Sequence, residues 1–137
     1  MIFLNSANIG FRIGQSNKLS KGSEKVDCLF CKIIKGEIPS KKVYEDDHVY
    51  AFHDINPLAP VHVLTIPKKH ITSLLDIGEE DKELIGHLHL ALQKIAKQMG
   101  VDESGFRVIT NTGKEGQQTV FHLHYHLIGG RQLEWKM

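Results

Sequence analysis

The sequence has few cysteines, little net charge and no long apolar run, and each shortage excludes a class of protein. Only Cys28 and Cys31 among its 137 residues are cysteines, too few and too close for a secreted disulfide framework, so we expect a cytoplasmic protein. The formal net charge of +1 gives no electrostatic reason to expect nucleic acid or a membrane surface as a partner. No apolar stretch approaches the roughly 18 residues of a membrane span.

The remaining composition fits one domain preceded by an extension. A hydrophobic content of 41% with 24% charged residues is typical of a soluble domain that builds its core without disulfides. Residues 1–26 show no sustained hydrophobic period, and Met1–Leu4 is too short for the apolar segment of a signal peptide. We expect residues 1–26 to be a disordered extension and residues 27–137 to form the domain.

The hydrophobic patterns predict two helices and a set of strands. The clearest helix is Asp81–Met99, where apolar residues recur every three or four positions before Gly100. A shorter helical pattern runs over Cys28–Lys35. A hairpin is predicted to begin at Val43, turn at Asp46–Asp47 and return as a strand over His48–His53. Further strands are predicted at His62–Ile66, Phe106–Asn111 and Val120–Ile128. The order of these elements predicts an α+β domain with an antiparallel sheet.

The most informative run contains three alternating histidines. His122, His124 and His126 are separated by Leu123 and Tyr125. A period of two is that of a strand, which places the three imidazoles on one face and the apolar residues on the other. A spacing of roughly 6.6 Å between alternate residues suits groups that converge on a small anion better than three ligands of one metal.

This run resembles the signature of the histidine triad family, His-φ-His-φ-His-φ-φ with φ apolar, at all seven positions. The resemblance extends over Cys28–Trp135, and further matching stretches are Ala51–Pro57, His62–His70, Asn111 with Gly116–Thr119, and Gly129–Gln132 with Trp135. The ending is similar to that of the histidine triad nucleotide-binding branch, which contains purine nucleoside phosphoramidases. The resemblance implies a five-stranded antiparallel sheet with two helices, and a homodimer that joins two sheets into ten continuous strands.

The resemblance also implies roles for individual histidines. His124, in the middle of the triad, would be the nucleophile and would form a nucleotidyl-histidine intermediate. His126 would donate a hydrogen bond to the phosphate and stabilise its charge in the transition state. His62 would lie beside the same phosphate, although a hydrogen-bonded strand histidine without a catalytic role is an equal alternative.

Further matched positions would bind the nucleotide. Asp54 would accept hydrogen bonds from both ribose hydroxyls, and its alternative role is to cap the turn that follows. The slot for the base would be lined by Phe30, Ile33, Phe52 and Ile55, which are otherwise ordinary core residues. The phosphate and sugar side would be bound by Asn111, Gln118 and Thr119.

Cys28 and Cys31 raise the question of a metal. A Cys-x-x-Cys pair supplies half of a tetrahedral zinc site. Related triad proteins with this motif complete the site with the histidines that correspond to His70 and His122, and a closed site of this kind would be structural. A reduced thiol pair and a redox disulfide remain alternatives.

The predicted activity is hydrolysis of the P–N bond in purine nucleoside 5′-phosphoramidates, with no metal needed for the chemistry. A dinucleoside polyphosphate hydrolase and a non-catalytic dimeric nucleotide-binding module are the competing hypotheses. The Gly129–Gln132 ending argues against the first of these. No role is assigned to His87, and Lys68 is expected to be solvated.

Overall fold

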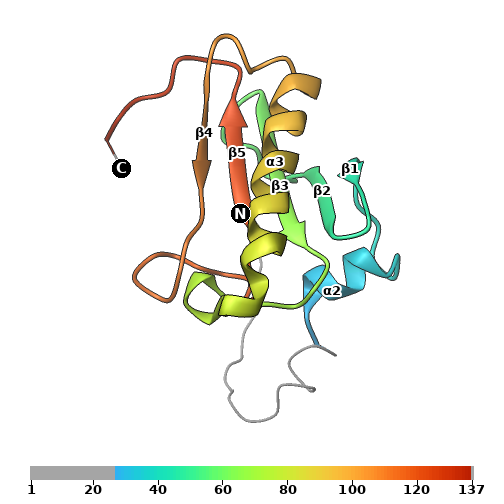
Figure 1. The fold of residues 1–137 in the computed structure, drawn as a ribbon. Coiled ribbons are helices and arrows are strands. Elements are labelled where there is room, and N and C mark those ends of the chain that lie inside the picture. Colours follow the sequence, from blue (N-terminus) through green and yellow to red (C-terminus); the bar gives the residue numbers. More distant parts are fainter. Residues whose placement is uncertain (1–26, 137) are drawn as a thin grey trace.

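The computed structural model describes residues 27–136, so the extension expected at residues 1–26 lies outside the described residues. Five strands form one antiparallel sheet in the order β1-β2-β3-β5-β4 (Figure 1). The strands are β1 (Lys42–Glu45), β2 (Val49–His53), β3 (Val61–Pro67), β4 (Phe106–Ile109) and β5 (Tyr125–Gly129). The prediction of an α+β fold with a five-stranded antiparallel sheet is confirmed.

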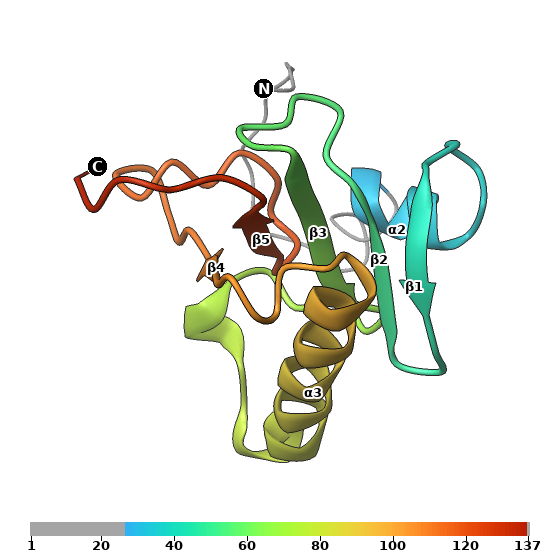
Figure 2. The ribbon, with the colours of Figure 1, turned by 90° about the horizontal axis from the view of Figure 1, so that it is seen from above.

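Two helices pack on opposite faces of this sheet (Figure 2). The short helix α2 (Leu29–Ile34) lies on one face, and the long helix α3 (Lys82–Gln98) covers the other. The 3-10 turns η1 (Leu74–Asp76) and η2 (Glu79–Asp81) lead into α3, and Gly100 ends it with a φ of 75° that favours glycine. No helix among residues 27–136 is long and apolar enough to cross a membrane.

Alternation along the strands sorts the core into two clusters. In β2, Val49 and Ala51 pack towards α3, whereas Tyr50 and Phe52 pack towards α2. Both β2 and β3 contribute to the two clusters because successive side chains of a strand point to opposite faces. Leu123, Tyr125 and Leu127 all belong to the cluster under α3. The apolar residues between the triad histidines therefore anchor that segment, which leaves the imidazoles for the α2 side.

The triad strand is shorter than the sequence predicts. Strand pairing begins only at Tyr125, opposite Thr65, so His122 and His124 precede β5. The partner strand ends at Pro67, which has no N–H for the ladder and whose carbonyl accepts a hydrogen bond from the His122 ring at 2.8 Å. The prediction of a strand over 120–128 is wrong in its first five residues, although the alternation of the two faces persists through them.

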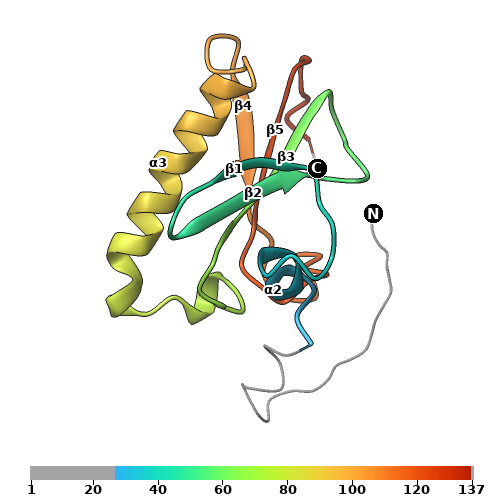
Figure 3. The ribbon, with the colours of Figure 1, turned by 90° about the vertical axis from the view of Figure 1, so that its right-hand side faces the viewer.

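A hydrogen bond joins the β1–β2 hairpin to α3, which lies beside it (Figure 3). Asp46 accepts hydrogen bonds from the amides of His48 and Val49, which fixes the predicted turn. Its second carboxylate oxygen lies 2.7 Å from Nε2 of His87 on α3. Lys68, expected to be solvated, pairs with Glu45 at 2.7 Å. These contacts join segments that are distant in sequence, so no local pattern indicates them.

Candidate functional site

The register of the two central strands brings His62 to the triad. In the β3–β5 pair, His62 lies opposite Ile128 and Leu64 lies opposite His126. His62 and His126 are therefore diagonal neighbours on the same face, close enough for their side chains to meet. Nε2 of His62 lies 2.9 Å from Nδ1 of His126. The site thus contains a histidine from β3 in direct contact with the third histidine of the triad.

The ring of His124 is held in one tautomer by the main chain. Its Nδ1 lies 2.7 Å from the carbonyl oxygen of His122. A carbonyl can only accept, so Nδ1 carries the proton and Nε2 carries the lone pair. Burial lowers the pKa of His124 to about 4, so the ring is neutral near pH 7. The middle histidine therefore presents an unprotonated nitrogen, the state that a nucleophile requires.

Two successive hydrogen bonds run from the Leu58 amide to His62 and from His62 to His126. The Leu58 amide donates to Nδ1 of His62 at 3.0 Å, so the proton of neutral His62 is on Nε2. That Nε2–H donates to Nδ1 of His126, which leaves the proton of His126 on its own Nε2. Burial, together with the neighbouring His124 and His62 rings, lowers the pKa of His126 to about 3. His126 is thus a neutral ring with one N–H available to an acceptor.

Asp54 lies at the end of β2, beside these histidines. Its amide donates to the His62 carbonyl, and its Oδ1 accepts from the Asn56 amide at 2.8 Å. Its Oδ2 lies 3.3 Å from Nε2 of His62. The carboxylate therefore combines the turn-capping role with a position next to the triad, and its oxygens retain lone pairs for further donors.

The apolar residues predicted for the base slot separate into two groups. Phe30 and Ile33 from α2 are buried with Phe52 from β2, and the Phe30 ring stands edge-on to Phe52 with 5.5 Å between ring centres. Phe30 also stands edge-on to His124 at 5.2 Å. Ile55 is 83% exposed, so the structure does not bring it into this cluster.

The loop before the triad positions Gln118 by its main-chain contacts. The side-chain nitrogen Nε2 of Gln118 donates to the main-chain carbonyls of Thr72 and Val120, and its side-chain oxygen Oε1 accepts from the Gly113 amide. In this arrangement Gln118 holds the loop and has no donor left for a phosphate. Asn111 is half-buried and Thr119 is exposed in the same loop. Direct contacts of these three residues with a nucleotide stay predictions.

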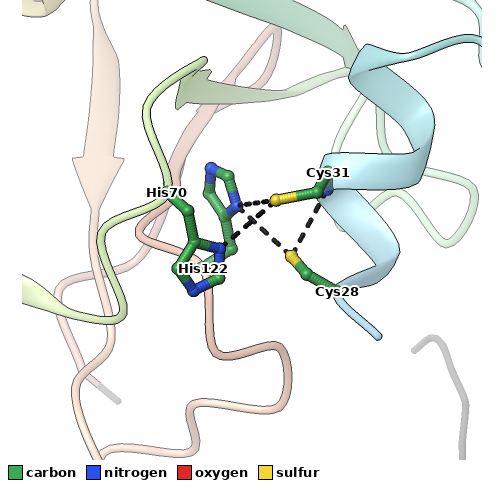
Figure 4. A group of neighbouring side chains, drawn as sticks. All are labelled: Cys28, Cys31, His70 and His122. Carbon is green, nitrogen blue, oxygen red and sulfur yellow. Dashed lines mark hydrogen bonds between the residues drawn. The ribbon is translucent and has the colours of Figure 1, made fainter. Parts of the chain in front are cut away.

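A second cluster unites the two cysteines with two histidines (Figure 4). The ligand atoms of Cys28, Cys31, His70 and His122 all lie within 4.8 Å of one another. Nδ1 of His122 is 3.3 Å from the Cys28 sulfur and 3.6 Å from the Cys31 sulfur, and Nδ1 of His70 is 3.3 Å from the Cys31 sulfur. A tetrahedral metal with ordinary bond lengths sets sulfur–nitrogen edges of about 3.6 Å. The four residues therefore fit a metal ion in size and in chemistry.

The protonation states of Cys31 and His122 also suit a cation. Nε2 of His122 donates to the Pro67 carbonyl, which leaves the lone pair of Nδ1 facing the sulfurs. The hydrogen bond from the Cys28 thiol lowers the pKa of Cys31 to about 4, which favours a thiolate, whereas the same hydrogen bond and burial raise the pKa of Cys28. A thiolate and an imidazole lone pair are the forms in which these residues bind metals. His122 thus belongs to this cluster by its ring and to the His124 site by its carbonyl.

Sequence reasoning missed the main-chain groups of the site. The Leu58 amide fixes His62, and the Pro67 carbonyl fixes His122. The sequence gives Arg131 no role beyond its place in Gly129–Gln132, but its guanidinium donates to the Leu58 carbonyl at 2.9 Å. Main-chain donors and acceptors carry no residue signature. Only the proline that ends β3 offers a sequence hint.

Comparison with known proteins places this arrangement in a family context. The model of the HIT domain family matches residues 35–133, a segment that contains the triad, His62 and Asp54 but begins after the two cysteines. An uncharacterized HIT-like protein of Synechococcus elongatus is 53% identical over 109 residues, covering 80% of this chain and 95% of that protein. A protein of Brassica juncea named 14 kDa zinc-binding protein is 50% identical over 111 residues, covering 80% and 97%.

Solved structures share the fold. The crystal structure of a HIT family hydrolase from Legionella pneumophila has a TM-score of 0.78 at 47% identity, covering 80% of this chain and 97% of that chain. A histidine triad nucleotide-binding protein from Candida albicans has a TM-score of 0.70 at 36% identity, covering 81% and 84%. The similarity therefore includes the sheet, both helices and the segments that carry the histidines.

Proposed function

The chain belongs to the HIT domain family, and on that premise we propose that it is a nucleotide hydrolase that cleaves the P–N bond of purine nucleoside 5′-phosphoramidates. The observation that carries the proposal is the hydrogen bond between Nδ1 of His124 and the His122 carbonyl. It leaves Nε2 of a neutral imidazole as the nucleophile. The name of the Legionella structure, a HIT family hydrolase, supports the reaction class.

The first half of the reaction is transfer of the nucleotidyl group to the enzyme. Nε2 of His124 attacks phosphorus, the P–N bond breaks, and the departing amine takes up a proton from the solvent. Negative charge on the phosphate oxygens grows in the transition state, and the Nε2–H of His126 donates to one of them. The low pKa of both buried rings keeps them neutral, so no histidine must lose a proton before the attack.

The second half releases the nucleotide. Water attacks the phosphorus of the nucleotidyl-His124 intermediate and gives up a proton to the solvent. The bond between phosphorus and Nε2 breaks, and the nucleoside monophosphate leaves with the added oxygen. His124 returns to its starting tautomer because the His122 carbonyl continues to accept from Nδ1. One donor, His126, can serve both steps because the same phosphate oxygens carry the charge in each.

Nucleotide recognition is proposed to use Asp54 and the cluster around Phe30. Asp54 would accept from the ribose hydroxyls with the lone pairs that Asn56 does not use. Phe30, Ile33 and Phe52 would offer apolar contacts for a purine, and Ile55 would close over it from its exposed position. Asn111, Gln118 and Thr119 would border the phosphate. The printed name of the Candida albicans protein supports nucleotide binding.

We propose that the cluster of Cys28, Cys31, His70 and His122 holds a structural zinc ion. The donor set is that of a closed tetrahedral site, with no position left for a substrate. Zinc would join α2 to the segments around β3 and β5, and no catalytic step passes through it. The name of the Brassica juncea relative supports this metal, since that relative is 50% identical over 111 residues.

The proposed assembly is a homodimer through the β4 edge. β4 is one of the two outer strands of the sheet, and Phe106 and Val108 on it are 40% and 38% exposed. Leu90 on α3 is also exposed. Pairing of two β4 edges would cover these residues and satisfy the free edge, and twofold pairs are the commonest homo-oligomers.

A substrate panel tests the proposed function. Purified protein is incubated with adenosine and guanosine 5′-phosphoramidates and with dinucleoside polyphosphates, and the release of monophosphate is measured. We expect turnover of the phosphoramidates to exceed that of the dinucleoside polyphosphates. Preference for the polyphosphates would assign the other hydrolase activity. Tight nucleotide binding with no turnover of any member would assign the non-catalytic module.

A further inference from the structure

Leu58 is held by its main chain at the edge of the site, although its side chain is 66% exposed. Its N–H donates to Nδ1 of His62 at 3.0 Å. Its carbonyl accepts from Nη2 of Arg131 at 2.9 Å, and Arg131 lies just after the end of β5 at Gly129. The loop between β2 and β3 is thus fixed between a histidine of the sheet and a cation of the C-terminal segment.

The Leu58 amide can act only as a hydrogen-bond donor. A peptide N–H can donate and cannot accept, so Nδ1 of His62 must keep its lone pair. A proton on that nitrogen would set two N–H groups against each other. The amide therefore opposes both the alternative tautomer and the doubly protonated ring. Since Nε2 of His62 then donates to His126, the state of the first ring sets that of the second.

We infer that the Leu58 amide, held in place by Arg131, is the group that sets the tautomers of His62 and His126 and thereby turns the N–H of His126 towards the reacting phosphate. The inference deepens the proposed function, on which it rests for the role of His126. Arg131 is then a positioning residue that acts through the main chain of Leu58. Its contact with a carbonyl, rather than with a side chain, makes the arrangement independent of the residue type at position 58.

The Leu58 amide also argues against a metal ion between Asp54, His62 and His126. Asp54, His62 and His126 offer ligand atoms within 4.8 Å of one another, the two-histidine and one-carboxylate set that many divalent cations accept. Binding through Nε2 of His62 would require the proton to move to Nδ1, where it would face the Leu58 N–H. The Leu58 amide thus keeps this cluster a chain of hydrogen bonds.

The charged groups around His62 predict how its titration responds. Burial lowers the pKa of His62, and Asp54 at 3.3 Å opposes that shift. His126 faces the same nitrogen, and His124 lies behind it with 5.2 Å between the centres of the His124 and His126 rings. Loss of the Leu58 donor leaves the attraction of Asp54 for a protonated ring and removes the opposition at Nδ1. The titration midpoint of His62 should then move to higher pH.

The test replaces one atom group. The α-hydroxy analogue of leucine, incorporated at position 58, exchanges the N–H for an ester oxygen and keeps the side chain. Nitrogen-15 imidazole spectra of the full protein without substrate report the tautomers. In the parent protein, both His62 and His126 should show protonated Nε2 and unprotonated Nδ1. In the ester protein, His62 should gain protonation at Nδ1, and its midpoint should rise by about one pH unit.

Arg131 variants give a second test if the ester protein does not fold. Arg131→Gln should produce a smaller change in the same direction, and Arg131→Lys, which keeps a cationic donor, should restore most of the parent spectrum. Arg107→Gln is the matched control, because Arg107 donates in the same way to a main-chain carbonyl, that of Glu134 at 2.8 Å, and not to that of Leu58. Equal changes in the Arg131→Gln and Arg107→Gln proteins would overturn the role of Arg131.

Kinetics connect the tautomers to the reaction. The ester protein should lose at least about tenfold in kcat on the phosphoramidate, with KM within about twofold of the parent, because a misdirected donor mainly affects the transition state. Unchanged spectra and an unchanged midpoint in the ester protein would overturn the inference. If the parent protein turns over none of the substrates but the ester protein still shows altered spectra, the tautomer assignment is upheld and only the proposed function is refuted.

Discussion

The imidazole of His124 donates from Nδ1 to the main-chain oxygen of His122 at 2.7 Å, while the ring of His122 turns towards two cysteines. One residue therefore orients the proposed nucleophile with its backbone and joins the Cys/His cluster with its side chain. Phe30 adds a second link, since it lies on the cysteine-bearing helix and packs against His124. Order in α2 should consequently affect the geometry of the site.

Metal analysis tests whether the cluster that contains the His122 ring binds zinc. Protein purified without chelator should contain about one zinc per chain, and Cys28→Ser with Cys31→Ser should abolish it. The double variant should unfold at lower temperature, because the ligands join distant segments. Turnover should persist in part, since His124 is not a ligand. A parent protein without zinc, and with stability equal to that of the variant, would leave the cysteines as a thiol pair.

Ribose recognition by Asp54 predicts a selective loss of affinity. Asp54→Asn should weaken binding of a nucleoside monophosphate by about 1–3 kcal/mol, the scale of a lost charged hydrogen bond. The matched 2′,3′-dideoxy nucleotide lacks the hydroxyls and should be affected much less. Calorimetric titration of both ligands measures the difference. Equal losses for the two nucleotides would argue for a general disturbance of the turn that Asp54 caps.

The link between the hairpin and α3 predicts a pH-dependent stability. Burial alone would raise the pKa of Asp46, but hydrogen bonds from the His48 and Val49 amides, Tyr44 and His87 outweigh it and hold that pKa below its ordinary value. A depressed pKa stabilises the folded state above the unfolded pKa of about 3.9, and this contribution is lost as the pH falls through the folded pKa.

Asp46→Asn should therefore reduce the free energy of unfolding near pH 7 by about 1–3 kcal/mol, and the difference from the parent should shrink below about pH 4. Urea unfolding over this pH range measures it. Asp47→Asn, at the exposed neighbour in the same turn, is the control and should change little. A loss that stays constant with pH would mean that the charge of Asp46 does not contribute.

The dimer proposal predicts that one charge on the β4 edge separates the subunits. Val108→Glu should give a monomer, because a twofold interface sets each new carboxylate close to its own copy. Leu75→Glu, at a residue that is 80% exposed in η1, should keep the parent mass. Light scattering at micromolar concentration distinguishes roughly 15.5 kDa from twice that value. A parent protein that is monomeric at all concentrations would refute the proposal.

Local periodicity carries much of the fold in this sequence. The apolar face of α3 and the two-sided strands follow from spacings of three or four and of two, and Leu88 and Leu127 are buried as those spacings require. The alternation in the triad likewise placed the imidazoles opposite Leu123 and Tyr125. What local spacing could not give was the start of β5, because that start is set by pairing with Thr65 of β3, which is distant in sequence.

The candidate site was less accessible to sequence reasoning than the fold. The residue types of the triad and of the Cys/His cluster were evident, and the structure brings both groups together. The tautomers depend on main-chain groups of Leu58, Pro67 and His122, which any residue type can supply. The hydrogen bond between Asp46 and His87 spans 41 positions, so it follows from the packing of α3 and from no local motif.

Capture of the covalent intermediate tests the central claim most directly. Protein mixed with adenosine 5′-phosphoramidate is quenched in alkali within the first turnover, and intact mass and peptide mapping locate any adduct. A single nucleotidyl group on His124 is expected, with no adduct and a loss of several orders of magnitude in turnover for His124→Asn, which should still fold and bind nucleotide. Near-parental turnover in His124→Asn, or an adduct on another residue, would contradict the assignment of the nucleophile.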